Sequence, residues 1–360
     1  SGASPTSDPQ SLPVLLAMRV WWCLVLLLAA ATFALNPSSG TAEPPAEPLT
    51  KAEKDALRTQ AFNKWMRSWS PINAKLEVTD VPNMGRGLVA TVEIAHKEKI
   101  LAIPMKYILT RETILPDLDR GWQRAVSTMT ENDLIITYLL MQRALKRESR
   151  FYRWIAVLPK KFSTPVHWGE DVIRQLEMPN DQRRLLGHKQ RAQADYRQLS
   201  SLWLKRLTPQ DLETHYSYGR YLWASAVVST RAWNMRGRKY LIPVAGMFNH
   251  DLDDEDRNFK WQTFSGQRSQ KFLTYHFFET STSRRLNEVP GMDAYAIVLS
   301  DRACQPGEQV FESYGDNDNA IYLDYHGFVP QHNPYECVKI YSLQIKGYGN
   351  AKFSMDTLPF

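Results

Sequence analysis

The sequence is poor in cysteine, and this scarcity excludes two common ways of stabilising a fold. Its 360 residues contain three cysteines, Cys23, Cys304 and Cys337, which are too few for a disulfide framework. None of them forms a Cys-x-x-Cys pair or a Cys/His cluster with the spacing of a zinc site. We therefore expect no structural metal.

The chain also lacks a strong excess of charge of one sign. It has 44 Lys and Arg against 38 Asp and Glu, which gives a net charge of +6. That excess is mild for this length and does not indicate a dedicated nucleic-acid binder. With 43% apolar and 23% charged residues, disorder, collagen and a pure coiled coil are excluded. A chain of this size can bury a sizeable core in one large or two modest domains.

A long apolar run is missing except near the N-terminus. Arg19 precedes an apolar run from Val20 to Leu35, and Thr32 and Ala34 suit positions −3 and −1 of a signal-peptidase site. The run is shorter than the roughly 20 residues that span a bilayer. We predict a signal peptide that directs the chain into the secretory pathway, with a plastid or an endomembrane compartment as onward destinations. A short membrane anchor and, less favoured, a buried core helix are the alternatives.

The rest of the chain changes pattern twice. After a Pro-rich linker that completes residues 1–50, apolar residues recur at helical spacing from Lys51 to Trp69. Helical patterns then dominate from Glu131 to Tyr221. The segments predicted as strands are 74–79, 87–94 and 99–103, which we expect to form one small antiparallel sheet, and 240–244, 271–279, 295–300 and 309–314. This layout predicts an α+β domain whose sheet is completed by distant segments.

Two glycines in Asn83 to Leu88 form the first motif that could carry chemistry. Gly85 and Gly87 flank Arg86 between two predicted strands. Bare backbone can approach a ligand closely there, and its amides can bind a carboxylate. A plain tight turn is the alternative interpretation.

An amide and an imidazole stand side by side at Asn249-His250, after a predicted strand. They could hydrogen-bond the amino and carbonyl groups of a ligand. For such a pair taken alone, a turn is the favoured interpretation. The acidic run that follows, Asp251 to Asp256, lacks the glycine and the closing Glu of a calcium-binding EF-hand loop. We interpret it as a solvated acidic loop.

The third motif, Gly307 to Gly315, is a turn and a strand that deliver Tyr314 to a glycine-containing bend. A phenol in that position could orient a nucleophile or take part in proton transfer. Alternatively, Tyr314 is a sheet aromatic with a hydrogen-bonded hydroxyl.

Seven basic residues lie from Arg143 to Lys161, with Phe151, Tyr152 and Trp154 interleaved. Such a stretch could attract nucleic acid or an acidic protein. The alternative is a solvated helix face whose aromatic residues point into the core.

In their order and spacing, these motifs resemble the SET-domain protein methyltransferases. Two further segments resemble insert motifs of the branch that contains the Rubisco large-subunit lysine methyltransferase and the actin histidine methyltransferase. The match covers roughly residues 60–335. The matching segments are Gly85-Arg86-Gly87, Leu158 to Trp168, Trp223 to Arg231, Asn249-His250, Gly307 to Val310, Tyr314, Asn319-Ala320 and Gly327-Phe328.

The resemblance implies a pseudoknotted β fold in which the strand carrying Tyr314 passes beside Asn249-His250. The SET domain would span 51–335 with a helical insert at about 120–235, and 336–360 would begin a truncated substrate-binding domain. The implied activity is methyl transfer from S-adenosylmethionine to a lysine, or less favourably a histidine, of a protein. The missing cysteine-rich zinc segment argues for a non-histone substrate.

The resemblance also implies roles for individual residues. Tyr314 would be catalytic, with its hydroxyl aimed at the transferring methyl. Tyr295 and His326 would line the substrate channel, with a core aromatic as the favoured alternative for Tyr295. We expect a monomer without metal or nucleic acid. The cofactor would be bound by Gly85, Arg86, Gly87, Leu88, Arg231, Asn249, His250 and Phe328.

Three departures from the family pattern stand out. Gly246 occupies a position where this branch usually has Asp, and His326 stands where the lysine enzymes usually have Tyr. Residues 251–294 form a longer and more polar connection. A catalytically inactive SET-type scaffold that binds protein is therefore the alternative to an enzyme.

Overall fold

A computed structural model describes residues 48–235, 238–250, 273–277, 295–300, 302–338 and 358–359. The chain divides into two units, Ser1–Thr50 and Lys51–Phe360, and only residues 48–50 of the first unit are described. The apolar run at Val20 to Leu35 lies outside the described residues. Within the described part, every helix is too short or too polar to cross a membrane.

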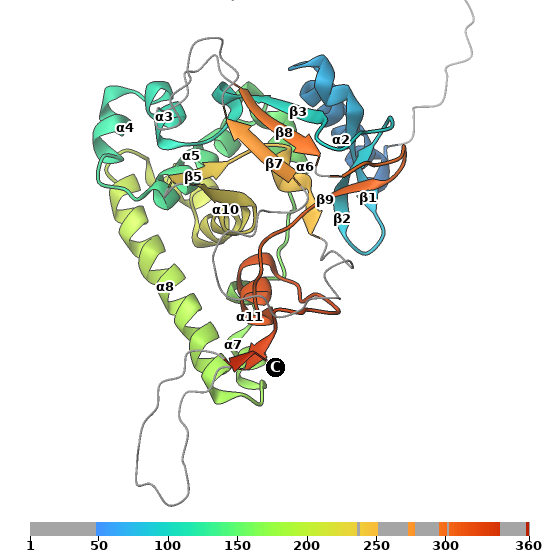
Figure 1. Cartoon of the computed structure of the whole chain (residues 1–360). Helices are drawn as coiled ribbons and strands as arrows, with labels where there is room; N and C mark the ends of the chain where they lie inside the picture. The colour runs from blue at the N-terminus through green and yellow to red at the C-terminus, as the bar shows by residue number, and fades with distance from the viewer. Residues whose placement is uncertain are drawn as a thin grey trace, which may run out of the picture. The chain divides into compact units, whose positions relative to one another are not determined.

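The strands of the second unit form small sheets (Figure 1). One sheet has the order β1 (Leu76–Val81), β2 (Gly85–Ala90), β9 (Gln309–Glu312) and β6 (Asn249–His250). A second has the order β3 (Lys99–Pro104), β8 (Tyr295–Ser300) and β7 (Leu273–Phe277). The pairs are β4 (Ala232–Met235) with β5 (Arg238–Leu241), and β10 (Cys337–Val338) with β11 (Leu358–Pro359).

The three early strands do not form one sheet, so that prediction was wrong. β1 and β2 form an antiparallel hairpin from Leu76↔Ala90 to Val81↔Gly85, whereas β3 pairs with β8. The burial pattern gives the physical reason. In β3 every residue from Ile100 to Pro104 is buried, so this strand needs cover on both faces, while β1 alternates at its start. The prediction that distant segments complete the sheets is confirmed, because β9 pairs with β2 and β8 with β3.

Helices surround these sheets, and most of them belong to the insert between β3 and β4. The α-helices are α2 (Lys51–Arg67), α3 (Arg111–Ile114), α4 (Arg120–Ala125), α5 (Glu131–Ala144), α6 (Tyr152–Val157), α7 (Glu170–Arg174), α8 (Pro179–Trp203), α9 (Pro209–His215), α10 (Tyr218–Arg231) and α11 (Asn319–Ile321). Short 3-10 turns lie at η1 (Pro71–Lys75), η2 (Met105–Tyr107), η3 (Leu115–Asp117), η4 (Lys146–Glu148), η5 (Pro165–His167) and η6 (Ala245–Met247). A π-helical turn, η8 (Tyr322–His326), follows α11 directly.

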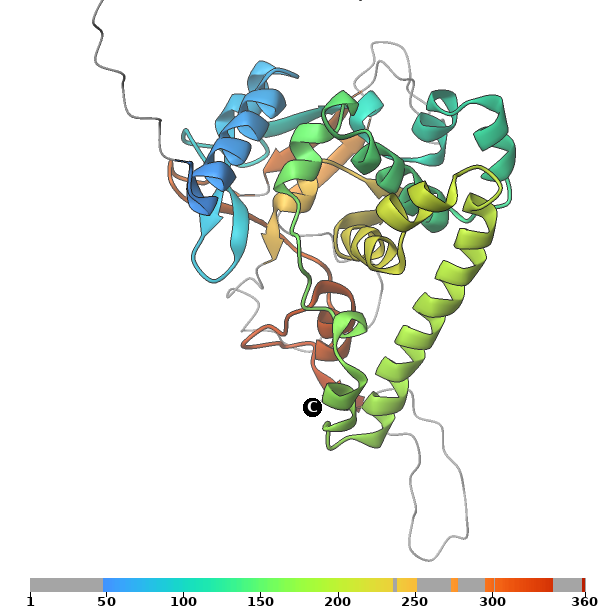
Figure 2. The same ribbon diagram turned by 180° about the vertical axis from the view of Figure 1, so that it is seen from behind.

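The long helix α8 runs past α10 and reaches α7 and the C-terminal segments, as both views show (Figures 1 and 2). Its start is set by Pro179 at the first helical turn, where a missing N–H costs nothing. The buried side chains Leu185, Leu199 and Trp203 attach it to the rest of the insert. The helix thereby connects the core of the insert with the segment that follows β9.

Two buried asparagines join α2 and η1 to both sheets. The side chain of Asn63 accepts from the backbone N–H of Val78 and donates to its carbonyl, at 2.8 Å each. Asn73 makes the same pair of hydrogen bonds with the backbone of Ala102 in β3, at 2.7 and 3.0 Å. Buried amides satisfied in this way fix the relative placement of β1 and β3.

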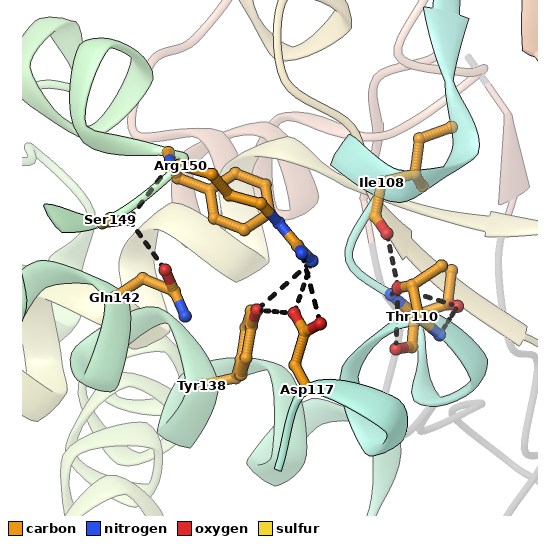
Figure 3. Close-up of polar contacts among 9 residues, drawn as sticks. Ile108, Thr110, Asp117, Tyr138, Gln142, Ser149 and Arg150 are labelled. Atoms are coloured by element: carbon orange, nitrogen blue, oxygen red, sulfur yellow. Dashed lines mark hydrogen bonds and ion pairs between the residues drawn. The ribbon is translucent and has the colours of Figure 1, made fainter. Parts of the chain in front are cut away.

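In the basic stretch from Arg143 to Lys161, two of the three aromatic side chains are buried. Phe151 and Trp154 belong to the core. Arg150 forms an ion pair with Asp117, and Asp117 also accepts a hydrogen bond from the hydroxyl of Tyr138 (Figure 3). Two of the three interleaved rings are therefore unavailable for stacking on bases, which favours the interpretation as a solvated helix face.

Candidate active site

Tyr314 lies where two segments that are distant in the sequence run side by side. β6 pairs with β9 in parallel, with Asn249 opposite Phe311 and His250 opposite Glu312. Two residues beyond β9, the backbone N–H of Tyr314 donates to Nδ1 of His250 at 3.1 Å. This is the adjacency of Tyr314 and Asn249-His250 that the sequence predicts.

The side chain of Tyr314 is fixed by a second hydrogen bond. Its hydroxyl donates to the carbonyl of Phe248 at 2.7 Å. Burial and the carboxylate of Glu312 raise the pKa of Tyr314, and the positive charge of Arg231 opposes them only in part. The phenol therefore stays protonated, with its oxygen held beside the backbone just ahead of Asn249.

His250 is a buried, neutral imidazole. Its Nδ1 lies 3.1 Å from the backbone nitrogen of Tyr314 and 3.2 Å from the carbonyl oxygen of Glu312, so it accepts from the first in one tautomer and donates to the second in the other. Burial lowers the pKa of His250 to about 4. At neutral pH this side chain orders the backbone at Tyr314 without adding a charge.

Tyr314, His250, His326, Phe328 and Tyr322 form one aromatic cluster. Tyr314 stacks on His250 with ring centroids 5.0 Å apart and on His326 with centroids 4.6 Å apart. Phe328 lies 6.0 Å from His250, and Tyr322 lies 4.9 Å from it. Three predicted site residues other than Tyr314 thus meet at its ring. Burial, reinforced by the nearby positive charge of Arg231, lowers the pKa of His326 to about 4.

A cavity of about 590 Å³ opens beside this cluster. Arg231, Tyr314 and His326 line it, and these are three of the residues that the sequence nominates. The hairpin β4–β5, which sequence reasoning missed, supplies Trp233, Asn234 and Lys239 to the wall. No motif marks these hairpin residues, since only the fold brings them to the cavity.

Arg231 is a half-buried cation in the wall of this cavity. It ends α10, donates from one terminal nitrogen to Thr230 Oγ1 at 2.6 Å, and places its guanidinium 5.5 Å from the ring of Phe162. Its Nε is enclosed and has no hydrogen-bond partner among the described residues. Burial lowers the pKa of Arg231, which Tyr314 partly offsets. A half-buried guanidinium with an enclosed, unused Nε donor suits an anionic ligand group.

Comparison with known proteins was made by sequence and by structure. No family model matches the chain. SET domain-containing protein 4 of Mus musculus is 24% identical over 301 residues, which cover 81% of this chain and 63% of the mouse protein. Protein SET DOMAIN GROUP 40 of Arabidopsis thaliana is 26% identical, covering 73% of this chain and 54% of that protein. Actin-histidine N-methyltransferase of Drosophila melanogaster is 23% identical, covering 79% and 51%.

The solved SET domain of LSMT bound to lysine and AdoHcy aligns with 82% of this chain and 62% of its own, with a TM-score of 0.65 and 17% sequence identity. This chain has the SET-domain fold. The predicted fold class and the resemblance are both confirmed. A structure of Rubisco LSMT bound to AdoMet aligns with a TM-score of 0.60 at 18% identity. The SET domain described here spans about half to two thirds of the length of the curated relatives that it matches.

One departure of this SET domain from its family pattern has a structural reason. A Cβ atom added to Gly246 would lie 3.0 Å from both Cβ and Cγ of Arg231. The stem of Arg231 thus occupies the space that a side chain at Gly246 would need. An aspartate at this position would require Arg231 to move. The observed orientation of the Arg231 side chain therefore depends on glycine at position 246.

The glycine motif lies beside Asn249. A Cβ atom on Gly87 would come within 2.8 Å of the Asn249 amide nitrogen and 2.3 Å of the Gln309 amide oxygen. These two amides are hydrogen-bonded to each other at 2.7 Å. Gly85 has φ +73°, a left-handed conformation that favours glycine.

The side chains of Arg86 and Leu88 have other roles in the SET domain. The guanidinium of Arg86 donates to the carbonyl of Val157 at 2.8 Å and to Thr59 Oγ1 at 3.3 Å, which ties β2 to α6 and α2. Leu88 is fully buried in the core. Neither side chain faces the cavity, and the backbone of Leu88 lies between Val78 of β1 and Val310 of β9 in the sheet.

Tyr295 is not brought to the cavity. It pairs with Pro104 at the end of the β3–β8 ladder and is absent from the cavity wall. The acidic run at Asp251 to Asp256 lies outside the described residues. Within the described ranges, no three His, Cys, Asp or Glu side chains gather closely enough to hold a metal ion.

Proposed function

We propose that this SET domain is an S-adenosylmethionine-dependent protein N-methyltransferase that acts on a lysine side chain of a non-histone protein. The observation that carries the proposal is one cavity wall that holds both the Tyr314 phenol and the half-buried Arg231 guanidinium. The first group can orient a nucleophile, and the second can bind the carboxylate of a cofactor.

The residues present fit the cofactor. Arg231, whose Nε lacks a partner among the described residues, would bind its carboxylate. The backbone around Gly85 and Gly87 would approach the methionine part, and Asn249 with His250 would hold its polar groups. Phe328 is 37% exposed and offers a ring face to the adenine. S-Adenosylmethionine supplies an electrophilic methyl group on a positively charged sulfur.

The residues of the SET domain would then work by position and electrostatics. The nearby imidazoles of His250 and His326 are neutral and too weakly basic to deprotonate an ammonium group, since their pKa values are about 4. The substrate nitrogen must therefore lose its proton through its environment. An enclosed wall with the positive charge of Arg231 lowers the pKa of an entering lysine, and Tyr314 would orient the neutral amine for attack.

Lysine is the proposed target, with histidine as the alternative. Among the relatives, one of Arabidopsis thaliana is named a fructose-bisphosphate aldolase lysine N-methyltransferase and is 27% identical, while others are named actin-histidine N-methyltransferases. Incubation of the purified chain with S-adenosylmethionine and a pool of unmethylated proteins, followed by mass-spectrometric mapping, tests the assignment. Methyl groups mapped only to histidine nitrogens would contradict it.

Calorimetric titration with S-adenosylmethionine and S-adenosylhomocysteine tests the enzyme against the inactive scaffold. We expect both to bind. A well-folded sample that binds neither compound would refute the enzyme and favour a SET-type scaffold that binds protein. Binding without any transfer to the protein pool would also favour the scaffold.

We further propose that the N-terminal segment directs the protein into the secretory pathway. The support comes from the sequence alone, in the apolar run from Val20 to Leu35 and the small residues Thr32 and Ala34 near its end. Translation in the presence of microsomes tests this proposal. We expect cleavage after Ala34 and protection from added protease, and an uncleaved, protease-accessible chain would refute it.

A further inference from the structure

The π-helical turn η8 places its residues on different sides of the candidate active site. Tyr322 is fully buried, His326 lines the cavity, and Tyr325 lines the cavity while remaining 48% exposed. π-Helical turns are rare and occur often at functional sites, because the extra residue changes which side chains face inward. The orientation of this turn therefore determines how His326 and Tyr325 shape the cavity.

The helical insert holds this turn through Asp324. Arg184 of α8 forms an ion pair with the Asp324 carboxylate, and the side chain of Asp324 is only 5% exposed. His188, one turn further along α8, lies 3.9 Å from the same carboxylate oxygen. Arg184 is itself oriented by Asp181, at 3.0 Å. Two residues on one face of α8 thus contact the carboxylate of Asp324, the residue before Tyr325.

A second contact holds the end of the turn. Ser163 donates to the carbonyl of Gly327 at 2.7 Å. Gly327 has φ +80°, and a Cβ atom there would lie 3.0 Å from the backbone nitrogen of Thr164. Lys189 of α8 donates to the carbonyls of Val166 and Trp168 at 3.0 and 2.6 Å, so the segment that contacts Gly327 is itself tied to α8.

The Arg184–Asp324 pair is poorly explained by stability alone. A buried ion pair loses in desolvation about as much as it gains in attraction, and apolar residues of similar volume often serve as well. The other oxygen of Asp324, Oδ1, is enclosed and has no hydrogen-bond partner among the described residues, which adds to the cost. What the pair does provide is a directional contact between the insert and η8.

We propose that Asp324 is a positioning residue: through its ion pair with Arg184, α8 sets the orientation of η8 and hence of Tyr325 and His326 at the cavity. This inference rests on the proposed methyltransferase function for its catalytic consequence. Its structural part, the coupling of α8 to η8, is independent of any activity.

The test compares three variants of the full chain, Asp324→Asn, Arg184→Met and the double variant. Arg184→Met leaves the buried Asp324 carboxylate without its partner and should lower the melting temperature most, whereas Asp324→Asn leaves Arg184, which is 27% exposed, still paired with Asp181 and should lower it less. The double change removes both charges and should recover part of the loss of Arg184→Met. Hydrogen exchange of residues 319–328 should be about tenfold faster in all three variants, with exchange in β3 and β8 unchanged in the double variant. Glu170→Gln, which removes an exposed ion pair of α7, is the matched control.

Activity provides the second readout, with a pool of unmethylated lysine peptides as substrate. In the double variant we expect kcat/KM to fall about tenfold, while the affinity for S-adenosylhomocysteine remains within about twofold. A double variant that regains normal exchange and normal kcat/KM along with its melting temperature would overturn the proposal, and so would normal exchange in Asp324→Asn. A wild-type chain that methylates no peptide refutes the proposed function, while the exchange rates still decide the coupling.

Discussion

The imidazole of His326 stacks on the phenol ring of Tyr314, with ring centroids 4.6 Å apart and an angle of 28° between the planes. The tyrosine usual at this position in the lysine enzymes would supply a ring and a hydroxyl. Here the ring contact is kept, and an imidazole stands in place of the phenol. The imidazole is neutral because burial lowers the pKa of His326 to about 4. The substitution therefore changes the hydrogen-bonding character of the cavity wall without adding charge.

Tyr314→Phe should slow methyl transfer by about 10²- to 10³-fold, because it removes the hydroxyl that we propose orients the nucleophile. The affinity for S-adenosylmethionine should change by no more than about threefold. Tyr322→Phe is the matched control, because the hydroxyl of Tyr322 also donates to a backbone carbonyl, that of Gly315, at 2.6 Å. Radiometric transfer assays and calorimetry measure both quantities. Equal loss of turnover in the two variants would show that Tyr314 has no special role.

Arg231→Met should weaken cofactor binding while leaving the fold intact. The change removes a half-buried cation that forms no ion pair with a described carboxylate, so the free energy of unfolding should stay nearly constant. Loss of a charge-assisted contact should raise the Kd for S-adenosylmethionine about tenfold or more. Arg143→Met, which removes a guanidinium 4.1 Å from the Trp223 ring and away from the cavity wall, is the control. Unchanged affinity in Arg231→Met would refute the assigned role.

Stability should fall as the pH is lowered from about 6.5 to about 4. Burial lowers the pKa of His250 to about 4 in the folded chain, from an unfolded value of 6.5, and that of His326 falls similarly. In this window the unfolded chain binds protons that the folded chain does not, so protonation favours unfolding. His250 alone accounts for about 3 kcal/mol across the window. Urea titrations from pH 4.5 to 7.5 measure this slope.

The variant His326→Phe should flatten that pH dependence, whereas His332→Gln, at an exposed imidazole, should leave it as it is. Identical slopes in the wild type and in His326→Phe would contradict a buried, neutral His326.

Gly327→Ala should destabilise the fold more than Gly85→Ala. Both glycines have positive φ, so each alanine introduces backbone strain of about 1–2 kcal/mol. At Gly85 nothing lies within 4 Å of the added methyl, whereas at Gly327 it would meet Ser163 and the backbone of Thr164. We expect a total loss of about 3–4 kcal/mol at Gly327. Chemical denaturation measures the difference, and equal losses would show that the close contact carries no energy.

The sequence predicted Tyr314 and Asn249-His250 correctly as neighbours because their motifs keep a recognisable order. It could not predict which strands pair, because alternating apolar residues identify a buried face and not a partner; β3 was therefore assigned to the wrong sheet. The contact of Gly246 with Arg231 also had no sequence signal, since it depends on how the hairpin β4–β5 returns the chain to α10. Tyr295 was nominated by its strand, but only the fold shows that this strand does not reach the cavity.

The placement of β8 and β9 has a consequence for the order in which the chain can fold. The hairpin of β1 and β2 and the strand β3 are made early, yet their partners begin at Tyr295 and Gln309. Roughly 200 residues must therefore leave the ribosome before either early segment is covered. Until then β3, buried along nearly its whole length in the final fold, exposes an apolar edge. The helical insert can thus pack before either sheet is complete, and Tyr314 arrives only in the step that closes both sheets.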